Sequence, residues 1–365
     1  MGGLPGSLDA SFNPGLGAND EVRAIVVQPD GRILAGGRFK EFDGAAIAGL
    51  VRLSLDGRLE KTFVPQPQGT VLALALQPDG RVLLGGDFTT VGGEPRRRIA
   101  RLLPDGTLDR SFDARGVLNR EVRALALQPD GKILVGGSFD AAPAHKRLTR
   151  LNADGTRDPT FNPGAGASRI VWALALEPDG KILAGGDFTS FNGQTSGRLV
   201  RLLADGARDT SFDIGTGANN TVSAVYVQDD GKILVGGRFT TINGVPAGHV
   251  ARLNPDGSLD SEFNAGTGVD GSVRSFAAQH SGKILIGGTF ASVQGVPRNR
   301  VARLDANGAV DTSFDPGEGA VDGDLWRLAL QTDRSLVIAG GFRSFNGVDC
   351  GRMARLNLGP APGAR

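Results

Sequence analysis

The stretch EVRALALQPDGKILVGGSF, residues 121–139, decides the fold, because it encodes two strands with a turn between them and returns along the chain. Its Gly-Gly doublet, followed by one residue and then Phe, recurs at spacings of 49 to 52 residues. The Phe of each copy lies at Phe39, Phe88, Phe139, Phe188, Phe239, Phe290 and Phe342. A period near fifty, built from short strands, is typical of β-propeller blades. The sequence therefore predicts an all-β, seven-bladed β-propeller.

Each copy contains the signals for four antiparallel strands. In the third copy, Pro129-Asp130-Gly131 suits a three-residue hairpin loop, since Pro fixes its φ and Gly supplies a positive φ. Ile133, Leu134 and Val135 then run without a polar break, which indicates a strand buried on both faces. The copy continues with RLTRLN, the turn ADG and TRDPTF. These segments supply the predicted third and fourth strands.

An arginine and an acid eight residues later flank the second turn of nearly every copy. The hairpin Pro255-Asp256-Gly257 would set Asn254 opposite Ser258, and therefore Arg252 opposite Asp260. The same spacing of eight residues would pair Arg52 with Glu60, Arg101 with Asp109, Arg150 with Asp158, Arg201 with Asp209 and Arg303 with Asp311. A cross-strand pair contributes roughly 0.2 to 1 kcal/mol and needs no ligand to explain it. We interpret these residues as structural.

The two ends of the chain complete one blade. The last copy stops after Arg355-Leu356-Asn357, and the N-terminus begins with a spare fourth strand, Ser7 to Phe12, so residues 6–12 are expected to complete the last blade. Arg355 would then face Asp9 and both sheet edges would be paired. We expect one domain over residues 1–365, a ring that opens when the first twelve residues are deleted, and a monomer.

Composition excludes several function classes. Forty Lys and Arg against 39 Asp and Glu give no field that would hold nucleic acid or an acidic membrane. Cys350 is the single cysteine, so no internal disulfide forms, and no Cys or His cluster has metal-site spacing. Neither an export signal nor a membrane span is visible. We expect no metal or cofactor; a complete chain would be cytoplasmic, whereas a trimmed one could belong to an exported or cell-surface protein.

The motif QPDGKILVGGxF, followed by RLxxDGxxDxSF, resembles the delta-60 repeat family of bacterial β-propellers over nearly the whole chain. The seventh copy departs from it at Ala339-Gly340-Gly341-Phe342. The resemblance implies a propeller, commonly in exported or surface-associated bacterial proteins, and implies no settled activity. The kelch repeat also carries a Gly doublet at a similar period, but its Tyr and Trp partners are absent here.

Variation between the copies points to a candidate site. The second residue of each first strand is the most variable position, and it holds both tryptophans: Arg23, Leu72, Arg123, Trp172, Ser223, Arg274 and Trp326. Near the mouth of a central channel, three guanidinium groups and two indoles could hold an anionic or sugar-like ligand. The alternative is that they cap the blade interfaces, with the Arg stems lying on apolar surface.

The residue after the Gly doublet varies too and forms a predicted rim. Arg38 and Asp87, and likewise Asp187 and Arg238, occupy neighbouring blades, so we expect ion pairs between blades. The two carboxylates could instead serve acid and base roles or bind a metal, but no third ligand is evident. Arg97 and His145, in the loops between second and third strands, make part of the rim basic. A partner with an acidic patch could use that charge, although a short charge run is usually a solvated surface.

Three functions remain open from the sequence. The first is a non-enzymatic binding or scaffold propeller that presents its variable face to a protein, a glycan or a small anionic ligand. The second is a hydrolase or lactonase-like enzyme with its site at the channel mouth, which requires converging acids or a metal. The third is a purely structural module of a larger assembly, which an exposed apolar patch would favour. No catalytic residue is predicted.

Overall fold

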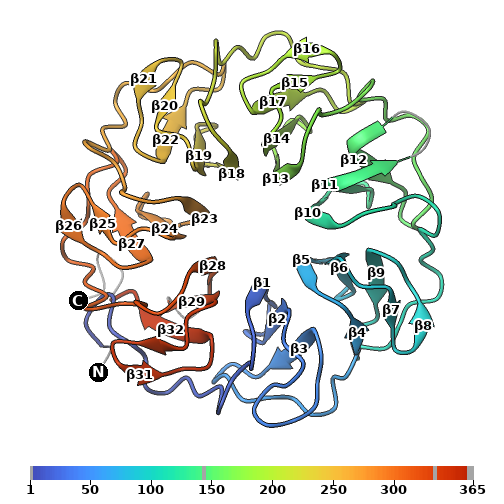
Figure 1. Ribbon diagram of the computed structural model, residues 1–365, viewed down its shortest axis with the longest axis vertical. Coiled ribbons are helices and arrows are strands. Elements are labelled where there is room, and N and C mark those ends of the chain that lie inside the picture. The colour runs from blue at the N-terminus through green and yellow to red at the C-terminus, as the bar shows by residue number, and fades with distance from the viewer. Residues whose placement is uncertain (1–2, 142–144, 332–334, 360–365) are drawn as a thin grey trace.

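The computed structural model describes residues 3–141, 145–331 and 335–359, and over these ranges it contains strands but no helix. Figure 1 shows the sheets arranged around a central axis, with the first strand of each repeat innermost. Seven sheets of three antiparallel strands follow the seven copies of the repeat. The predicted all-β propeller with seven repeats is therefore confirmed. In keeping with its strand composition, the described part of the chain has no helix capable of crossing a membrane.

Three strands form the body of each blade. The inner strands are β1 (Val22–Val27), β5 (Val71–Leu76), β10 (Val122–Leu127), β13 (Val171–Leu176), β18 (Val222–Val227), β23 (Val273–Ala278) and β28 (Leu325–Leu330). The middle strands are β2 (Ile33–Gly37), β6 (Val82–Gly86), β11 (Ile133–Ala141), β14 (Ile182–Gly186), β19 (Ile233–Gly237), β24 (Ile284–Gly288) and β29 (Ser335–Gly340). The outer strands are β3 (Leu50–Leu53), β9 (Ile99–Leu102), β12 (His145–Leu151), β17 (Leu199–Leu202), β22 (Val250–Leu253), β27 (Val301–Leu304) and β32 (Met353–Asn357).

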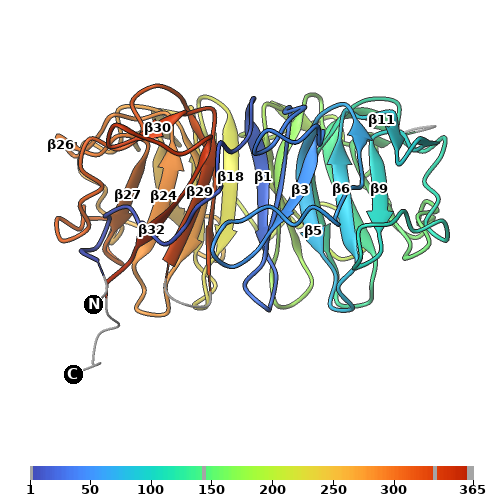
Figure 2. The same ribbon diagram turned by 90° about the horizontal axis from the view of Figure 1, so that it is seen from below.

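Short strands occupy the loops between the middle and outer strands. They are β7 (Thr90–Val91), β8 (Glu94–Pro95), β15 (Ser190–Phe191), β16 (Gln194–Thr195), β20 (Thr241–Ile242), β21 (Val245–Pro246), β25 (Ser292–Val293), β26 (Val296–Pro297), β30 (Ser344–Phe345) and β31 (Val348–Asp349). A further short strand, β4 (Pro67–Gln68), lies in the connection between the first two blades and pairs with β7. Figure 2 shows these loops at one end of the barrel-shaped body and the tight hairpins between body strands at the other. The first end is called the loop face below.

Each body sheet has three strands, and the predicted fourth strand is reduced to a single antiparallel bridge with the outer strand, as between Leu151 and Arg157. The cause is the acid that follows. Asp158 accepts hydrogen bonds at its Oδ1 atom from the backbone N–H and the hydroxyl of Thr160, at 2.9 and 2.7 Å. Such a side-chain turn bends the chain and brings Phe161 into the core, where its side chain is 1% exposed.

The glycines of residues 121–139 have two separate structural roles. Gly131 has φ of 83°, and its N–H donates to the carbonyl of Gln128 at 3.0 Å, which closes the predicted hairpin. Gly136 lies against the next blade, where a Cβ atom would come within 2.8 Å of Val171 Cγ1. Gly137 lies against the backbone oxygen of Glu121 and has no room for a Cβ atom. The doublet is thus required by close packing on two sides.

The hydrophobic core lies between neighbouring blades. One cluster joins Leu134 and Leu148 of the third blade to Ile182 and Phe188 of the fourth. The fourteen repeat phenylalanines predicted as core are all buried: Phe12, Phe39, Phe63, Phe88, Phe112, Phe139, Phe161, Phe188, Phe212, Phe239, Phe263, Phe290, Phe314 and Phe342. Because such clusters contain residues of two neighbouring blades, neighbouring blades stabilise each other.

The predicted Arg–acid pairs form, and each arginine also reaches the next blade. Arg150 donates from Nε to Asp158 at 2.7 Å and from Nη1 to the carbonyl of Ala204 at 2.5 Å. Its guanidinium carbon lies 4.8 Å from the centre of the Phe161 ring. The same three contacts are made by Arg52, Arg101, Arg201, Arg252, Arg303 and Arg355. These seven residues with their acids are called the arginine ladder.

The N-terminal segment pairs with the last blade as predicted. Leu8 forms a bridge with Leu356, and Arg355 donates to Asp9 at 2.8 Å. The N–H of Asp9 donates to the carbonyl of Arg355 at 2.8 Å. A core cluster further joins Met353 of this blade to the first blade, whose inner strand β1 lies beside β28. The ends of the chain therefore meet in one blade.

Candidate functional site

A bulge at the second residue of every inner strand builds the site. In β1 the register with β2 shifts between Val22 and Ala24, which leaves Arg23 as the extra residue, and every other inner strand shifts at the same point. A bulge takes one residue out of the ladder and redirects its side chain. Here it directs seven side chains towards the axis at the loop face.

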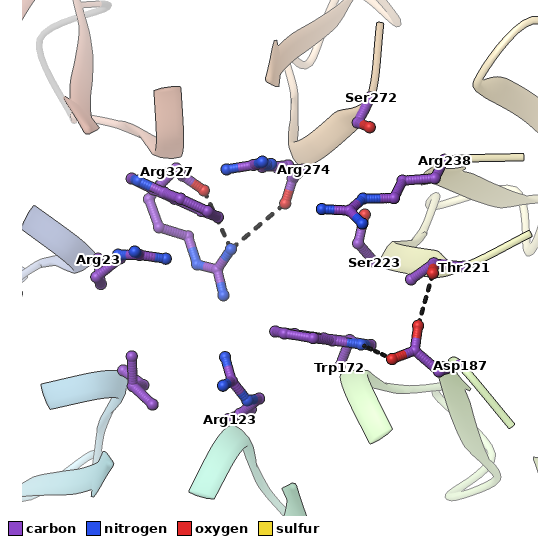
Figure 3. A pocket seen from close by; sticks show the side chains of 12 residues that line it. Arg23, Arg123, Trp172, Asp187, Thr221, Ser223, Arg238, Ser272, Arg274 and Arg327 are labelled. Carbon is purple, nitrogen blue, oxygen red and sulfur yellow. Dashed lines mark hydrogen bonds between the residues drawn. The ribbon is translucent and has the colours of Figure 1, made fainter. Parts of the chain in front are cut away.

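These seven residues surround one cavity, called the channel-mouth cavity, with a volume of about 160 Å³. Its lining comprises Arg23, Leu72, Arg123, Trp172, Asp187, Thr221, Ser223, Arg238, Ser272, Arg274, Trp326 and Arg327. One lining thus contains Arg23, Arg123, Trp172, Ser223, Arg274 and Trp326. Figure 3 labels all of these except Trp326. A further cavity of about 210 Å³ shares five of these residues and continues along the axis.

Trp326 is enclosed by two arginines. The guanidinium carbons of Arg23 and Arg274 lie 3.7 and 3.5 Å from the centre of its ring. Two guanidinium groups at these distances do not fit on one face of an indole, so each covers one face. The interaction is of the cation–π type. Neither face of Trp326 is left for another ring.

Trp172 has a different environment at the same repeat position. The guanidinium carbon of Arg123 lies 4.2 Å from the centre of its ring. Its Nε1 atom donates to Asp187 at 2.9 Å, and the other oxygen of that carboxylate accepts from Thr221 at 2.6 Å. Figure 3 shows Arg123 on one side of the indole and Ser223 on the other, towards the cavity.

Three of the lining guanidinium groups have carboxylate partners. Arg23 donates from Nε to Glu21 at 2.8 Å, Arg123 from Nη2 to Glu121 at 2.6 Å, and the Nη1 atom of Arg274 lies 3.1 Å from Asp324. Burial lowers the pKa of Arg274 to about 10, and the attraction of Asp324 only partly opposes this shift. Arg238 and Arg23 lower it further by repulsion. The cationic form of Arg274 is therefore destabilised in this lining.

Two other lining guanidinium groups have no carboxylate partner among the described residues. Arg238 is exposed and makes no ion pair there. Arg327 donates from Nη1 to the carbonyls of Trp326 and Arg274, at 3.1 and 3.4 Å. Burial lowers the pKa of Arg327, and repulsion from Arg23 adds to the shift. Figure 3 shows Arg327 extending into the middle of the cavity.

Sequence reasoning missed Arg327, Thr221 and Ser272. A signal for Arg327 exists at the third position of the inner strands, which reads Ala24, Ala73, Ala124, Ala173, Ala224, Ser275 and Arg327. One guanidinium among small side chains marks a position where packing does not require a large residue. For Thr221 and Ser272 the sequence carries no comparable signal, since both lie in loops before the inner strands.

The predicted ion pairs between blades on the rim are wrong. Arg38 lies 3.6 Å from Asp20, and Asp87 lies 3.0 Å from Arg98, so each pairs within its own blade. The backbone explains this, because the N–H of Arg38 donates to the carbonyl of Glu21 at 2.9 Å and holds the residue beside its own entry loop. Asp187 is held by the tryptophan and threonine described above rather than by Arg238.

The other basic rim residues are mostly engaged elsewhere. Arg97 lines a separate cavity with Arg98 and Arg115, away from the axis. Arg96 and Arg298 are buried rather than solvated. The backbone of His145 lies at the start of β12, and its side chain lies outside the description. Arg38, Asp87 and Arg97 therefore do not contribute to the channel-mouth cavity.

Metal ligands do not gather in the part of the chain that the structure describes, where no group of three His, Cys, Asp or Glu side chains could hold an ion. Cys350 is buried, and burial raises the pKa of its thiol to about 12. A thiol held in its protonated form is a poor nucleophile.

Comparison with solved structures gives the fold. The WD40 β-propeller domain of Doa1 is 15% identical, with a TM-score of 0.63, over 98% of this chain and 97% of that one. A chain of the mitotic checkpoint complex is 16% identical, with a TM-score of 0.58, over 96% and 94%. Virginiamycin B lyase from Staphylococcus aureus is 14% identical, with a TM-score of 0.57, over 93% and 95%. Identities this low show the fold alone.

Sequence comparison gives the family. No protein with a curated description matches the chain significantly. A family described as a β-propeller domain of unknown function, DUF5122, matches residues 28–63, 77–112, 128–161, 177–212, 228–263, 279–314 and 331–359. The matches begin at the residue before each first turn and together cover more than half of the chain. The chain therefore belongs to the DUF5122 β-propeller family.

Proposed function

We propose that this protein binds a small organic anion at the mouth of its central channel. The observation that carries the proposal is the pair of guanidinium groups, Arg238 and Arg327, that line one cavity without a carboxylate partner among the described residues. Burial desolvates Arg327, whereas Arg238 is exposed, and a desolvated charge without a counterion is costly. An anionic ligand would supply that counterion and would also raise the depressed pKa of Arg274.

Neutral donors complete the lining. The Ser272 hydroxyl has no acceptor among the described residues, and the Nε1 atom of Trp326 is buried without an acceptor there. Ser223 already donates its hydroxyl proton to the carbonyl of Val273 at 2.9 Å, so it supplies no donor to an anion. A few polar groups on a largely fixed wall are typical of small-molecule sites.

The cavity limits the size of the ligand. Its volume of about 160 Å³ is close to that of an engineered protein cavity of about 150 Å³ that admits benzene. A ligand of roughly that size, with one anionic group, matches both the volume and the charge. A protein or glycan partner would instead have to use the loop face around the mouth.

Binding is favoured over catalysis by the chemistry of the lining. A hydrolase or lactonase needs an acid and a base, and Asp187 is the only carboxylate among the residues of this lining. Both of its oxygens already accept hydrogen bonds, from Trp172 and Thr221. The fold likeness to a lyase, at 14% identity, adds no residue to this argument.

Calorimetric titration with acetate, benzoate and inorganic phosphate, at constant ionic strength, tests the proposal. We expect at least one of these anions to bind the purified protein, and Arg327→Met to weaken that binding at least tenfold. Arg343→Met is the matched control, because Arg343 is exposed and lies outside the cavity lining. Absence of binding beyond a chloride control, or unchanged binding by Arg327→Met, would overturn the proposal.

A further inference from the structure

The two tryptophans at the same repeat position give different information about a ligand. Trp326 has both faces covered by Arg23 and Arg274, at 3.7 and 3.5 Å. Its ring serves as a spacer that keeps two like charges apart. Within the described part of the chain, Arg123 is the one cation that stacks on Trp172, and the opposite side of the indole borders the cavity (Figure 3).

The plane of Trp172 is fixed before any ligand arrives. Its indole N–H donates to Asp187 at 2.9 Å, and Thr221 holds the same carboxylate at 2.6 Å. Glu121 holds Arg123 with a hydrogen bond of 2.6 Å, which keeps the guanidinium against the indole. A ring whose orientation is already fixed loses little conformational entropy when another ring stacks on it.

The positive charge lies where an acid attached to such a ring would place its anionic group. Arg327 extends into the middle of the cavity that Trp172 borders, and Arg238 lines the same space (Figure 3). The Nε and Nη2 atoms of Arg327 have no hydrogen-bond partner among the described residues. A guanidinium edge with two adjacent N–H donors matches the geometry of a carboxylate.

We propose, on the basis of the anion-binding function above, that the ligand is a planar aromatic carboxylate. Its ring stacks on the cavity face of Trp172, and its carboxylate accepts hydrogen bonds from Arg327. The cavity volume of about 160 Å³ suits one six-membered ring with a carboxylate. Trp326, enclosed on both faces, takes no part in the stacking.

A comparison of benzoate with cyclohexanecarboxylate distinguishes the contribution of the aromatic ring to affinity from that of the charge. Both compounds are monoanions on a six-membered ring, and only benzoate is planar and aromatic. We expect calorimetry to show benzoate binding about tenfold more tightly than cyclohexanecarboxylate. Trp172→Leu should remove this preference, and Trp172→Phe, which keeps an aromatic face, should retain most of it. Urea unfolding of each variant verifies that it is folded.

Each outcome decides between the two proposals. A benzoate preference that is lost in Trp172→Leu and kept in Trp172→Phe supports both. Equal binding of the two acids, abolished by Arg327→Met, leaves the anion site standing and overturns the aromatic ligand. Binding of phosphate but of neither carboxylic acid likewise leaves the anion site standing and overturns the aromatic ligand. Failure of every anion to bind overturns the proposed function itself.

Discussion

Arginines serve opposite purposes in the arginine ladder and in the channel-mouth cavity. In the ladder, Arg150 has an acid, a carbonyl of the next blade and a phenylalanine ring as partners. In the cavity, Arg327 has two backbone carbonyls and, among the described residues, no acid. Every ladder arginine has an acid partner at a position that the repeat keeps uniform, whereas Arg327, which has none, lies at a position where the other copies have alanine or serine. The pairing of a charge, rather than the residue type, therefore separates structural from functional arginines.

Deletion of residues 1–12 is expected to have the largest effect, because it breaks one ladder position completely. Arg355 would lose Asp9 and the ring of Phe12, and the outer edge of β32 would be exposed. Loss of a buried ion partner and of a core phenylalanine should lower the free energy of unfolding by more than about 5 kcal/mol. Urea unfolding followed by circular dichroism measures this. An unchanged urea midpoint would show that the segment is dispensable for stability. The control is Leu4→Ser, which changes an exposed residue of the same segment.

Arg150→Met removes the arginine of one ladder position without deleting any segment of the chain. Asp158, with 2% of its side chain exposed, would stay buried and lose one of its two cationic partners, while Lys132 would remain 3.1 Å away. We expect the free energy of unfolding to fall by about 3 to 5 kcal/mol. The comparison is with Arg343→Met, because Arg343 is exposed and makes no ion pair with another described residue. A loss below about 1 kcal/mol would mean that the ladder behaves like ordinary surface ion pairs.

Acid should weaken the ladder and leave the cavity arginines charged. Burial alone would raise the pKa of Asp158, but hydrogen bonds from Thr160, Lys132 and Arg150 outweigh it and hold the pKa well below 3.8. A carboxyl whose pKa is lower in the folded state stabilises the fold above its unfolded pKa, and this contribution is lost as pH falls below it.

The urea midpoint should therefore decline as the pH falls below about 4. Asp158 is expected to contribute on the order of 2 kcal/mol to that decline. In Asp158→Asn, the loss of stability on acidification should be smaller by the contribution of this one carboxylate. A pH dependence identical to that of the unmodified protein would contradict the role of this carboxylate.

Arg327→Met should have the smallest effect on stability. The substitution removes a desolvated cation and leaves an apolar side chain of similar length, so the free energy of unfolding should change by less than about 1 kcal/mol in either direction. Differential scanning calorimetry measures the shift. A loss of more than about 3 kcal/mol would place Arg327 among the structural arginines and remove the contrast between the two regions.

Most of the fold could be predicted from the repeat. The doublet at Gly136 and Gly137, the turn at Gly131 and the Arg–acid spacing all have local causes that recur in each copy. The fourth segment could not be predicted as reliably, because the Asp158 side chain competes with strand pairing for the backbone N–H groups.

The position of the candidate site could be predicted, but its internal pairing could not. The variable second residue of each inner strand marks the cavity, and the bulge that exposes it recurs in every blade. Trp326 meets Arg23 across the junction between the last blade and the first, a contact set by the geometry of the ring. Arg38 pairs with Asp20 because the backbone ties it to its own blade, which residue spacing alone does not reveal.

The contrast between the two regions is tested most directly by urea unfolding of Arg150→Met and Arg327→Met, each with and without benzoate. At a benzoate concentration one hundred times its dissociation constant, the unmodified protein should gain about 2.7 kcal/mol. Arg150→Met should be destabilised yet keep this gain, and Arg327→Met should keep its stability and lose the gain. If Arg327→Met is the variant that unfolds, or if it is stabilised by benzoate as strongly as the unmodified protein, the division between structural and ligand-binding arginines is contradicted.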